Sequence, residues 1–491
     1  MSWQPKVLGD FLAEKSSDRD ALVTVSGRLS YKDLFEKAKQ AAGAMQALGI
    51  GKGDRVAILL PNGEDWLALF YGAALIGAVT VPVNTRFKAS EVAFCLKQSS
   101  AMALFYVERF LGNDYGAMVR EIGFRNAFDV SRDVLPRQGM ESVPVEPRDL
   151  LLIQFTSGTT AYPKGAMLTH DSMLRNAWAA GARIGVRAED RYFNCRPFFH
   201  VGGSTLSALM ALVSGCCLVT LPTFEAGAAL QMLERERCTL ISGNDTIFQM
   251  LIGHEDFARR RLSLRGGWAA AGPQTMRQVI DRMGVKLVCA AYGLSEASPN
   301  VVMNDWRDPE PLRVAGLALP LPGLEVRISA EREIQVRGWG LMRGYVNDPE
   351  ATAKAFTPGG WLRTGDLGEL TADGRLRMVG RIKDLFRVGG ENVAPAEVEE
   401  MLLAHPAVET AQVVGVPDAR LGEVPCAYVT LKSGFHATEL EILSFAKART
   451  AGFRVPRYLR IVADFESIGM TASGKVQKQK LREHALREFK L

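Results

Sequence analysis

Two hydrophobic periods alternate along the first 150 residues of the chain. Short apolar runs typical of buried strands are separated by longer segments in which apolar positions recur every three or four residues, as in an amphipathic helix. The predicted strands are Arg28–Tyr31, Arg55–Leu60, Val79–Val83 and Ala101–Val107, and the predicted helices are Lys32–Leu48, Asp65–Ile76 and Ala89–Lys97. Strands that alternate with helices predict a parallel sheet covered on both faces.

The same alternation resumes after Pro147 and changes past Pro299. A helix is predicted from Asp171, and the predicted strands are Leu150–Phe155, Leu218–Leu221, Leu240–Ser242, Trp268–Ala271 and Leu287–Cys289. Short β-like segments with frequent Gly and Pro follow at Glu325–Ile328, Glu333–Arg337 and Arg375–Val379, and the last hundred residues return to a mixed pattern with helices near Pro395–Leu403 and Ala437–Ala448. We therefore expect an α/β protein. Residues 1–381 would form a large N-terminal domain of parallel-sheet layers plus a β-rich subdomain, and residues 382–491 a small mobile α+β C-terminal domain.

Composition and charge narrow the class of protein. Apolar residues make up 47% and charged residues 23% of the 491 residues, an ordinary globular balance. The net charge of +5 suits anionic small molecules and makes no strong case for nucleic acid or membrane. The apolar runs Leu67–Val83 and Thr205–Pro222 are interrupted by Gly and too short to span a bilayer, so each predicts a buried helix–turn–strand unit. The seven cysteines show no Cys-x-x-Cys spacing, which favours a reducing, cytoplasmic location without metal or disulfide frameworks.

The strongest chemical signal is the segment Phe155–Gly165. After Phe155 it holds four aliphatic hydroxyls, two glycines and one lysine, namely Thr156, Ser157, Gly158, Thr159, Thr160, Lys164 and Gly165. Glycine lets backbone N–H groups approach an anion, hydroxyls add donors and lysine supplies charge, so the segment predicts a phosphate-binding loop. It is not a Walker A loop, because Gly-x-x-x-x-Gly-Lys-Ser/Thr does not occur.

This loop resembles the phosphate loop of the adenylate-forming (AMP-binding) superfamily, and five further motifs follow in that superfamily's order. They are Tyr292-Gly293-Leu294-Ser295-Glu296, Thr364-Gly365-Asp366, the hinge segment Gly380-Arg381-Ile382-Lys383-Asp384, Gly389-Gly390-Glu391-Asn392-Val393 and Ser473-Gly474-Lys475. The resemblance is to the branch of acyl-CoA synthetases and covers nearly the whole chain.

The resemblance assigns a role to each motif. Lys475 would bridge the substrate carboxylate and the α-phosphate, Ser295 would contact that phosphate, and Glu296 would hold Mg²⁺. Asp366, whose two oxygens suit a vicinal diol, would accept the ribose hydroxyls, with Arg381 beside it and Tyr292 stacked on adenine. The remaining implied sites are Ala271, Gly272, Pro273 and Gly293 at the nucleotide, Lys383 as hinge, Gly389 and Gly390 toward coenzyme A, and His200, Gly202, Gly203, Asn244 and Ala291 around the acyl group.

The resemblance implies an ATP-dependent acid–CoA ligase that forms an acyl-AMP and then an acyl-CoA, using ATP, Mg²⁺, coenzyme A and a small carboxylic acid. Small Gly202 and Gly203 favour a medium- or long-chain fatty acid or an aromatic acid, whereas Asn244-Asp245, where apolar residues are usual, leave open a polar group on the acid. Three alternatives also stay open: loading of a separate carrier protein, a luciferase-like monooxygenase and a non-catalytic nucleotide-binding protein. Homodimerisation is a further open alternative, and we expect no integral membrane segment and no nucleic-acid partner.

Overall fold

The computed structural model describes residues 2–133, 136, 138–156, 163–432, 434–470 and 476–491. Its largest sheet, counted over these residues, has eight strands. In spatial order they are β16 (Asn300–Met303), β15 (Leu287–Gly293), β14 (Gly266–Ala270), β13 (Leu240–Asn244), β11 (Arg191–Asn194), β12 (Cys217–Thr220), β1 (Asp20–Val23) and β2 (Arg28–Ser30). The interior strands pair in parallel and only the edge strands β16 and β2 are antiparallel to their neighbours, as the alternating pattern predicts.

A second large sheet has six strands within the described ranges. Their order is β10 (Lys164–Thr169), β9 (Leu150–Thr156), β4 (Val79–Pro82), β3 (Arg55–Leu59), β5 (Ala103–Tyr106) and β8 (Ala127–Asp129). All neighbours are parallel except the β9–β10 pair. This antiparallel pair corrects one expected boundary, because Lys164 and Gly165 begin a strand and do not belong to a loop. A small hairpin is formed by β6 (Arg109–Phe110) and β7 (Asn113–Asp114).

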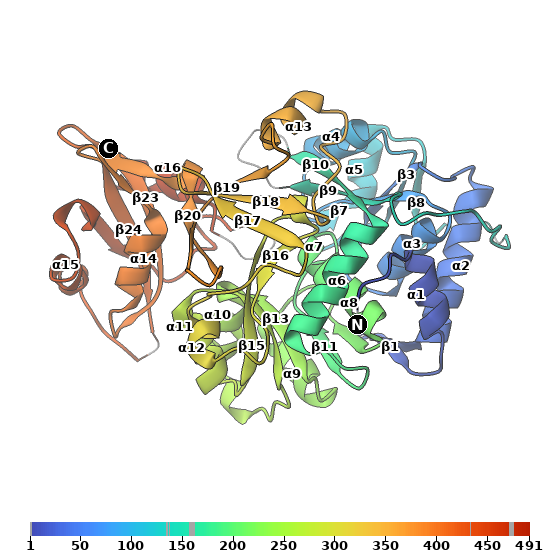
Figure 1. The fold of residues 1–491 in the computed structure, drawn as a ribbon, viewed down its shortest axis with the longest axis horizontal. Coiled ribbons are helices and arrows are strands. Elements are labelled where there is room, and N and C mark those ends of the chain that lie inside the picture. The colour runs from blue at the N-terminus through green and yellow to red at the C-terminus, as the bar shows by residue number, and fades with distance from the viewer. Residues whose placement is uncertain (1, 134–135, 137, 157–162, 433, 471–475) are drawn as a thin grey trace.

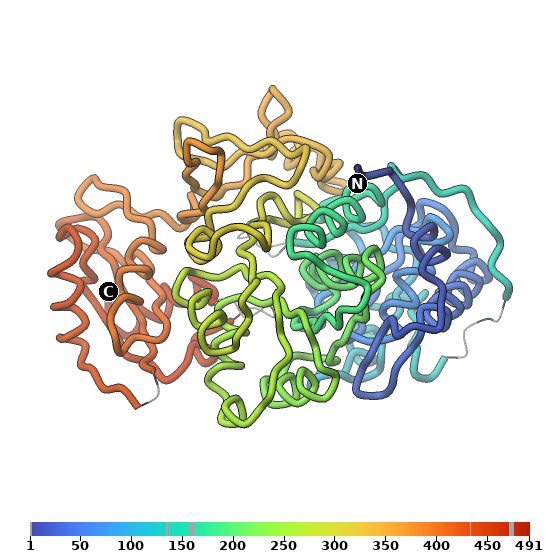
Figure 2. Tube along the Cα trace, turned by 60° about the horizontal axis from the view of Figure 1, so that its bottom comes forward, coloured from blue at the N-terminus to red at the C-terminus, as the bar shows by residue number. Residues whose placement is uncertain are grey.

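The β-rich subdomain and the C-terminal segment each have a separate sheet. The former is antiparallel, in the order β17 (Leu324–Ile328), β18 (Glu333–Gly338), β19 (Leu362–Leu370) and β20 (Leu376–Arg381). The latter contains β22 (Glu391–Val393), β21 (Phe386–Val388), β24 (Gly422–Leu431), β23 (Val408–Asp418) and β25 (Tyr458–Ile461). Figures 1 and 2 place this last sheet at one end of the molecule's long axis, away from the N-terminal helices.

Helices cover the faces of these sheets (Figure 1). The helices of the first 300 residues are α1 (Leu8–Lys15), α2 (Tyr31–Ala47), α3 (Glu64–Leu75), α4 (Ala89–Ser99), α5 (Tyr115–Ile122), α6 (His170–Ile184), α7 (Val201–Gly203), the π-helix η1 (Ser204–Leu209), α8 (Met210–Ser214), α9 (Ala226–Arg235), α10 (Asp245–Gly253), η2 (Phe257–Arg259), α11 (Pro273–Asp281) and η3 (Ser295–Ala297). Those that follow are α12 (Glu310–Val314), α13 (Pro349–Ala355), η4 (Ile382–Asp384), α14 (Pro395–Leu403), α15 (Glu439–Lys447), η5 (Gly452–Arg454) and α16 (Lys478–Glu488).

Helix α6 contacts strands of both large sheets and so holds them together. Its ends follow from local chemistry. The Thr169 hydroxyl accepts a hydrogen bond from the Ser172 backbone N–H at 3.1 Å, which satisfies one of the N–H groups that a helix start leaves unpaired. Gly185 ends the helix at φ +63°, a left-handed conformation that favours glycine.

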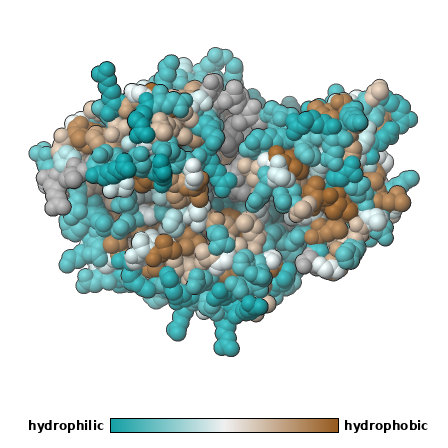
Figure 3. Space-filling view, turned by 180° about the vertical axis from the view of Figure 1, so that it is seen from behind, coloured by the Kyte–Doolittle hydropathy of each residue, from teal (hydrophilic) through white to brown (hydrophobic). Residues whose placement is uncertain are grey.

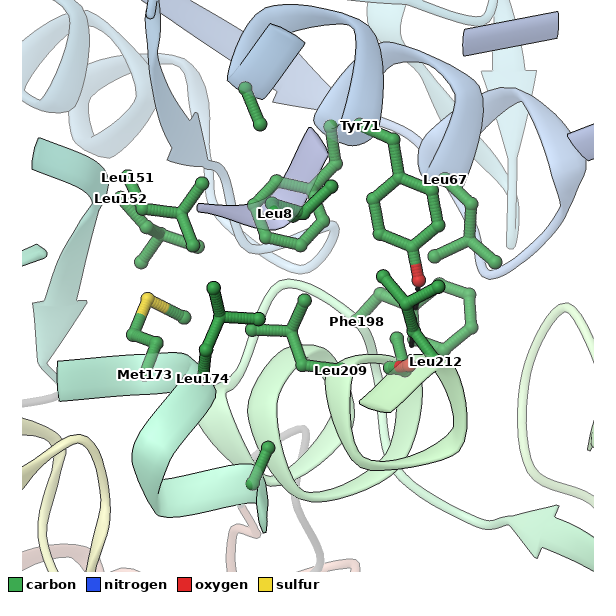
Figure 4. Packing of buried hydrophobic residues seen from close by; sticks show 14 of the residues in the cluster. Leu8, Leu67, Tyr71, Leu151, Leu152, Met173, Leu174, Phe198, Leu209 and Leu212 are labelled. Atoms are coloured by element: carbon green, nitrogen blue, oxygen red, sulfur yellow. Dashed lines mark hydrogen bonds between the residues drawn. The ribbon is translucent and has the colours of Figure 1, made fainter. Parts of the chain in front are cut away.

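The main core lies where α1 and α3 face α6, η1 and α8. Figure 4 shows Leu8, Leu67 and Tyr71 on one side of this layer and Leu174 and Leu209 on the other. These side chains are at most 1% exposed. Full burial of one such side chain contributes about 1.5–3 kcal/mol to stability. Packing in this layer therefore holds the two sheets in a fixed relative position. Seen from behind in Figure 3, the surface is mostly hydrophilic and hollowed near the centre of that face.

Both apolar runs of the sequence form buried helix–strand units, as predicted. Leu67–Val83 contains α3 and β4, and Thr205–Pro222 contains η1, α8 and β12. No helix in the described ranges combines the length and apolar character needed to cross a bilayer. All seven cysteines are buried free thiols.

The C-terminal segment has a hydrophobic core of its own. This cluster runs from Phe386 to Ala485 and draws no buried member from the preceding chain, within the described residues. The fold class is therefore confirmed, with parallel α/β layers, a β-rich subdomain and a C-terminal α+β unit. The boundary after Arg381 and the mobility of the C-terminal unit stay predictions.

Candidate functional site

Most of the predicted site residues lie where strands end. Asn244, Ala270 and Gly293 are the last residues of β13, β14 and β15, three neighbouring strands of the eight-stranded sheet. The carboxyl ends of parallel strands meet at one edge of a sheet, which is where α/β proteins bind ligands. The predicted strand Leu287–Cys289 is four residues too short, because Ala290 still pairs with β14 and Ala291–Gly293 pair with β16.

The strands on either side of the predicted phosphate loop face each other directly. Thr156 ends β9 and is paired with Lys164, the first residue of β10. The Thr156 hydroxyl donates to the Lys164 carbonyl at 3.4 Å. Ser157, Gly158, Thr159 and Thr160 lie outside the described residues, so their part of the prediction rests on the sequence.

Glu296 lies in the short helix η3, immediately after β15. Its Oε1 accepts a hydrogen bond from the Tyr345 hydroxyl at 2.8 Å, and its backbone carbonyl accepts from the Met342 N–H at 2.8 Å. The Lys164 ammonium lies 5.3 Å from the centre of the Tyr345 ring. Burial, and then the neighbouring Glu296 carboxylate, raises the pKa of Tyr345 far above its usual value, so this hydroxyl remains a donor.

Tyr345 was not singled out in the sequence. It lies 49 positions from Glu296, in an irregular Gly-Tyr-Val stretch that carries no motif of its own. Only the fold brings it between the predicted phosphate lysine, Lys164, and the predicted metal-binding carboxylate. Ser295 is half-buried beside Glu296 in the same short helix.

Tyr292, Asp366 and Arg381 form one group, held by a hydrogen bond and an ion pair. The Tyr292 hydroxyl donates to Asp366 Oδ2 at 2.8 Å, and Arg381 Nε lies 3.2 Å from Asp366 Oδ1. Asp366 is 5% exposed, whereas the Arg381 side chain is 44% exposed. Burial, and then the Asp366 carboxylate, raises the pKa of Tyr292 well above its usual value, so its hydroxyl stays protonated.

The strand geometry of β19 explains how Asp366 reaches this position. Asp366 is paired across the sheet with Arg381 of β20. Gly365 adopts φ +72°, and the Thr364 hydroxyl accepts from the Asp366 N–H at 3.1 Å, which makes an irregular turn within the strand. The Thr-Gly-Asp order is thus required by the backbone as well as by chemistry.

Gly293 is required by close backbone approach, whereas Gly272 lies at the start of a helix. A Cβ on Gly293 would lie 2.1 Å from the Pro299 carbonyl oxygen, so no larger residue fits the β15–β16 pair. Gly272 precedes Pro273, which is the first residue of α11, and its N–H donates to Asp245 Oδ1 at 3.0 Å. Ala271 is half-buried at the same strand end.

His200 caps the start of the short helix α7, and its Nδ1 accepts from the Gly202 N–H at 3.0 Å. A neutral imidazole that accepts at Nδ1 carries its proton at Nε2, so the ring can donate from that side. A Cβ on Gly203 would lie 2.2 Å from the Pro197 carbonyl oxygen. This backbone packing gives Gly203 a structural reason of its own, and its place beside an acyl chain stays a prediction.

Asn244 also has a structural explanation that the sequence interpretation missed. It is 4% exposed and its Oδ1 accepts from the Ile247 N–H at 3.0 Å, which caps α10. Asparagine before a helix is a recognised capping signal, so its presence does not by itself require a polar group on the acid. Ala291 is half-buried and packs against the main core.

Lys383 and the pair Gly389-Gly390 lie in the connection to the C-terminal unit. Lys383 belongs to η4, between β20 and β21, and partial burial together with the Arg381 guanidinium lowers its pKa. Gly389 and Gly390 form the β21–β22 turn at φ +59° and +96°. Lys475 lies outside the described residues. The residues flanking its segment, Met470 and Val476, form an isolated antiparallel bridge.

A cavity of about 340 Å³ adjoins the site. Its wall includes Arg196, Pro197 and Phe199, which immediately precede His200, and Met470 from the C-terminal unit. No group of three or more His, Cys, Asp or Glu side chains suited to a metal ion occurs within the described part of the chain.

Comparison with known proteins identifies relatives over nearly the full length. Residues 11–346 match the family described as AMP-binding enzyme, and residues 397–475 match its C-terminal domain. The chain is 34% identical to 3-[(3aS,4S,7aS)-7a-methyl-1,5-dioxo-octahydro-1H-inden-4-yl]propanoyl:CoA ligase of Rhodococcus jostii (strain RHA1), over 98% of this chain and 99% of that protein. It is 31% identical to the mitochondrial medium-chain acyl-CoA ligase ACSF2 of Mus musculus, over 98% of this chain and 87% of that protein.

Solved structures agree with this assignment. The O-succinylbenzoate coenzyme A synthetase MenE from Bacillus subtilis, in complex with AMP, superposes with a TM-score of 0.82 at 28% identity, covering 98% of each chain. The match therefore extends over both the large α/β part and the C-terminal unit.

Proposed function

The chain belongs to the AMP-binding enzyme family and is an AMP-forming acid–CoA ligase, and we propose that it activates a medium-sized or larger organic acid through an acyl-AMP intermediate. The observation that carries this proposal is the position of two groups of side chains at the carboxyl end of β15, which contributes Tyr292 to one group and is followed by Glu296 of the other. Lys164, Tyr345 and Glu296 form one, and Tyr292, Asp366 and Arg381 form the other.

In the first step an oxygen of the substrate carboxylate attacks the α-phosphorus of ATP, and pyrophosphate leaves. Asp366, which accepts from Tyr292 and pairs with Arg381, accepts the ribose hydroxyls, since the two oxygens of a carboxylate suit a vicinal diol. Ser295 and Lys164 contact phosphate oxygens, and Lys475 offsets the charge that develops there. His200 donates from Nε2 toward the acid.

Glu296 would hold Mg²⁺ against the phosphates. Magnesium prefers oxygen ligands and is commonly bound through one or two carboxylates plus substrate phosphates, and the Glu296 carboxylate is a ligand of this kind. The Tyr345 hydroxyl bond fixes one Glu296 oxygen. When bound, the ion would neutralise phosphate charge.

In the second step the thiol sulfur of coenzyme A attacks the acyl carbon, and AMP leaves. We propose that the C-terminal unit rotates about Lys383, withdraws Lys475 and brings the Gly389-Gly390 turn to the site. Hinged closure requires backbone changes at only a few residues.

The acid is expected to be larger than acetate. The relatives' names support this size, since one acts on a bicyclic propanoate and another on medium-chain acids. A reducing, cytoplasmic compartment is supported by the seven buried free thiols.

The half-reactions test the assigned lysine. In Lys475→Ala, carboxylate-dependent ATP–pyrophosphate exchange should collapse, whereas attack of coenzyme A on supplied acyl-AMP should survive. Lys490→Ala removes the same charge from an exposed position of the same unit and should leave both unchanged. Equal loss of both half-reactions in Lys475→Ala would contradict the role.

A panel of carboxylic acids tests the activity itself. With free coenzyme A present, accepted acids should release AMP and form the thioester. AMP release without thioester formation would instead indicate a carrier-protein acceptor, and no AMP release from any acid would refute the proposed function.

A further inference from the structure

Arg196 is a buried cation in the segment between β11 and α7. It is 4% exposed. Its backbone is held on both sides, because its carbonyl accepts from Asn62 Nδ2 at 2.9 Å and from Asn194 Nδ2 at 2.7 Å, and its N–H donates to Asn194 Oδ1 at 3.1 Å. These backbone hydrogen bonds fix the direction in which the Arg196 side chain projects from the main chain.

The Arg196 guanidinium has an aromatic neighbour, and two of its three nitrogens have no hydrogen-bond partner among the described residues. Its Cζ lies 5.2 Å from the centre of the Trp268 ring. Nε and Nη2 are buried without a hydrogen-bond partner among the described residues, and no carboxylate there pairs with them. Contact with an aromatic face compensates only partly for the hydrogen bonds that a buried guanidinium forgoes. Burial accordingly lowers the pKa of Arg196.

This side chain lines the cavity beside the carboxylate site. Arg196 and Arg86 contribute positive charge to the wall, and Glu466 is the acid that lines it within the described ranges. A Cβ on Gly202 would lie 3.6 Å from Arg196 Cδ and 3.2 Å from His200 Nδ1, so the arginine and the histidine flank the same glycine. An acid whose carboxylate meets His200 would extend past this arginine.

We propose that Arg196 determines acid specificity by hydrogen-bonding an acceptor oxygen, a ketone or a second carboxylate, on the acyl portion of the substrate. The inference rests on the proposed function and specifies its substrate class. A planar guanidinium on a tryptophan face presents several parallel N–H groups, which suits a carbonyl or carboxylate better than an apolar chain. An acid without such a group would leave the donors unpaired, and sites built to hydrogen-bond a substrate group discriminate strongly against analogues that lack it.

The test compares acids of equal length in ATP–pyrophosphate exchange without coenzyme A. Octanoate, 7-oxooctanoate and octanedioate differ only at the far end. The unsubstituted enzyme should prefer the oxo acid or the diacid over octanoate by at least about 10-fold in kcat/KM, since a hydrogen bond to a charged group is worth this much. In Arg196→Met this preference should fall by about 10- to 100-fold, and Arg196→Lys should retain part of it because it keeps the charge without the planar donors.

Two controls separate specificity from folding. Arg175 lies over the Trp339 ring at 4.4 Å, outside the cavity lining, so Arg175→Met makes the same change in an arginine–tryptophan pair and should leave the acid preference unchanged. Arg196→Met should unfold at the same or a higher temperature than the unsubstituted enzyme, because it removes an unpaired buried charge.

Each other result overturns the inference in a different way. If Arg196→Met keeps the same acid preference, or loses kcat/KM equally for all three acids, Arg196 does not determine acid specificity. If Arg196→Met changes only the KM for coenzyme A in the full reaction, the oxygen that Arg196 binds belongs to coenzyme A and not to the acid. If none of the acids tested supports ATP–pyrophosphate exchange by the unsubstituted enzyme, the proposed function is refuted, and the inference about Arg196 is refuted with it.

Discussion

Replacing Asp366 by asparagine probes the buried carboxylate at the centre of the nucleotide residues. The carboxylate accepts from the Tyr292 hydroxyl at 2.8 Å on one oxygen and lies 3.2 Å from Arg381 Nε on the other. The amide keeps one acceptor oxygen but replaces the second with an NH₂ donor. A donor then faces either the tyrosine hydroxyl or the guanidinium, so at least one of the two contacts is lost.

The magnitude follows from burial. Asp366 is 5% exposed, so solvent cannot replace the lost partner. A hydrogen bond to a charged group contributes about 1.5–3 kcal/mol, and we expect the free energy of unfolding to fall by about this amount. If the same carboxylate also accepts the ribose hydroxyls, the KM for ATP should rise about 10- to 100-fold, since 1.4 kcal/mol corresponds to a factor of ten.

Glu369 provides a matched control on the same strand. It pairs with Arg332 at 2.6 Å and Arg377 at 3.2 Å, but its side chain is 49% exposed. Exposed ion pairs contribute about 0–1 kcal/mol, so Glu369→Gln should change the stability little and leave the KM for ATP unchanged. Urea unfolding and pyrophosphate exchange at varied ATP measure both quantities. Equal effects of the two amide substitutions would refute the assignment of Asp366 to the nucleotide.

Three further predictions concern pH, the hinge and the thiols. Burial lowers the pKa of His170 to about 4, so the unfolded chain binds a proton that the folded chain excludes. The stability that comes from keeping His170 neutral is then fully present above about pH 6.5 and is lost as the pH falls toward 4. In His170→Asn the urea midpoint should therefore depend less on pH across that window. A pH dependence equal to that of the unsubstituted protein would contradict this role of His170. Lys383→Pro should lower thioester formation more than adenylation, and an unaffected second step would remove the hinge assignment. Burial raises the pKa of Cys195 to about 12, so the native enzyme should resist an aromatic disulfide reagent that labels all seven thiols once it is unfolded; rapid labelling of the native form would contradict this burial.

The sequence determined the fold class and the family because both depend on local patterns. Alternating hydrophobic periods located most strands of the two parallel sheets to within a few residues, since burial on both faces requires continuous apolar runs. The order of the motifs from the loop after Phe155 to Lys475 identified the superfamily. Boundaries were less certain where long-range pairing extends an element, as in β15, which continues to Gly293 only because β16 pairs with it.

Tertiary structure decided which side chains meet and what each small residue is for. Tyr345 reaches Glu296 across 49 positions, and no local pattern encodes that contact. Gly203 is required by the Pro197 carbonyl, and Asn244 caps a helix, although the sequence alone suggested pocket roles for both. Arg196 was not singled out in the sequence, because its unpaired donors and its position on the cavity wall follow only from packing. Periodicity reports which face of an element is buried, whereas the partner on the other side of that face is set by chain segments far away in sequence.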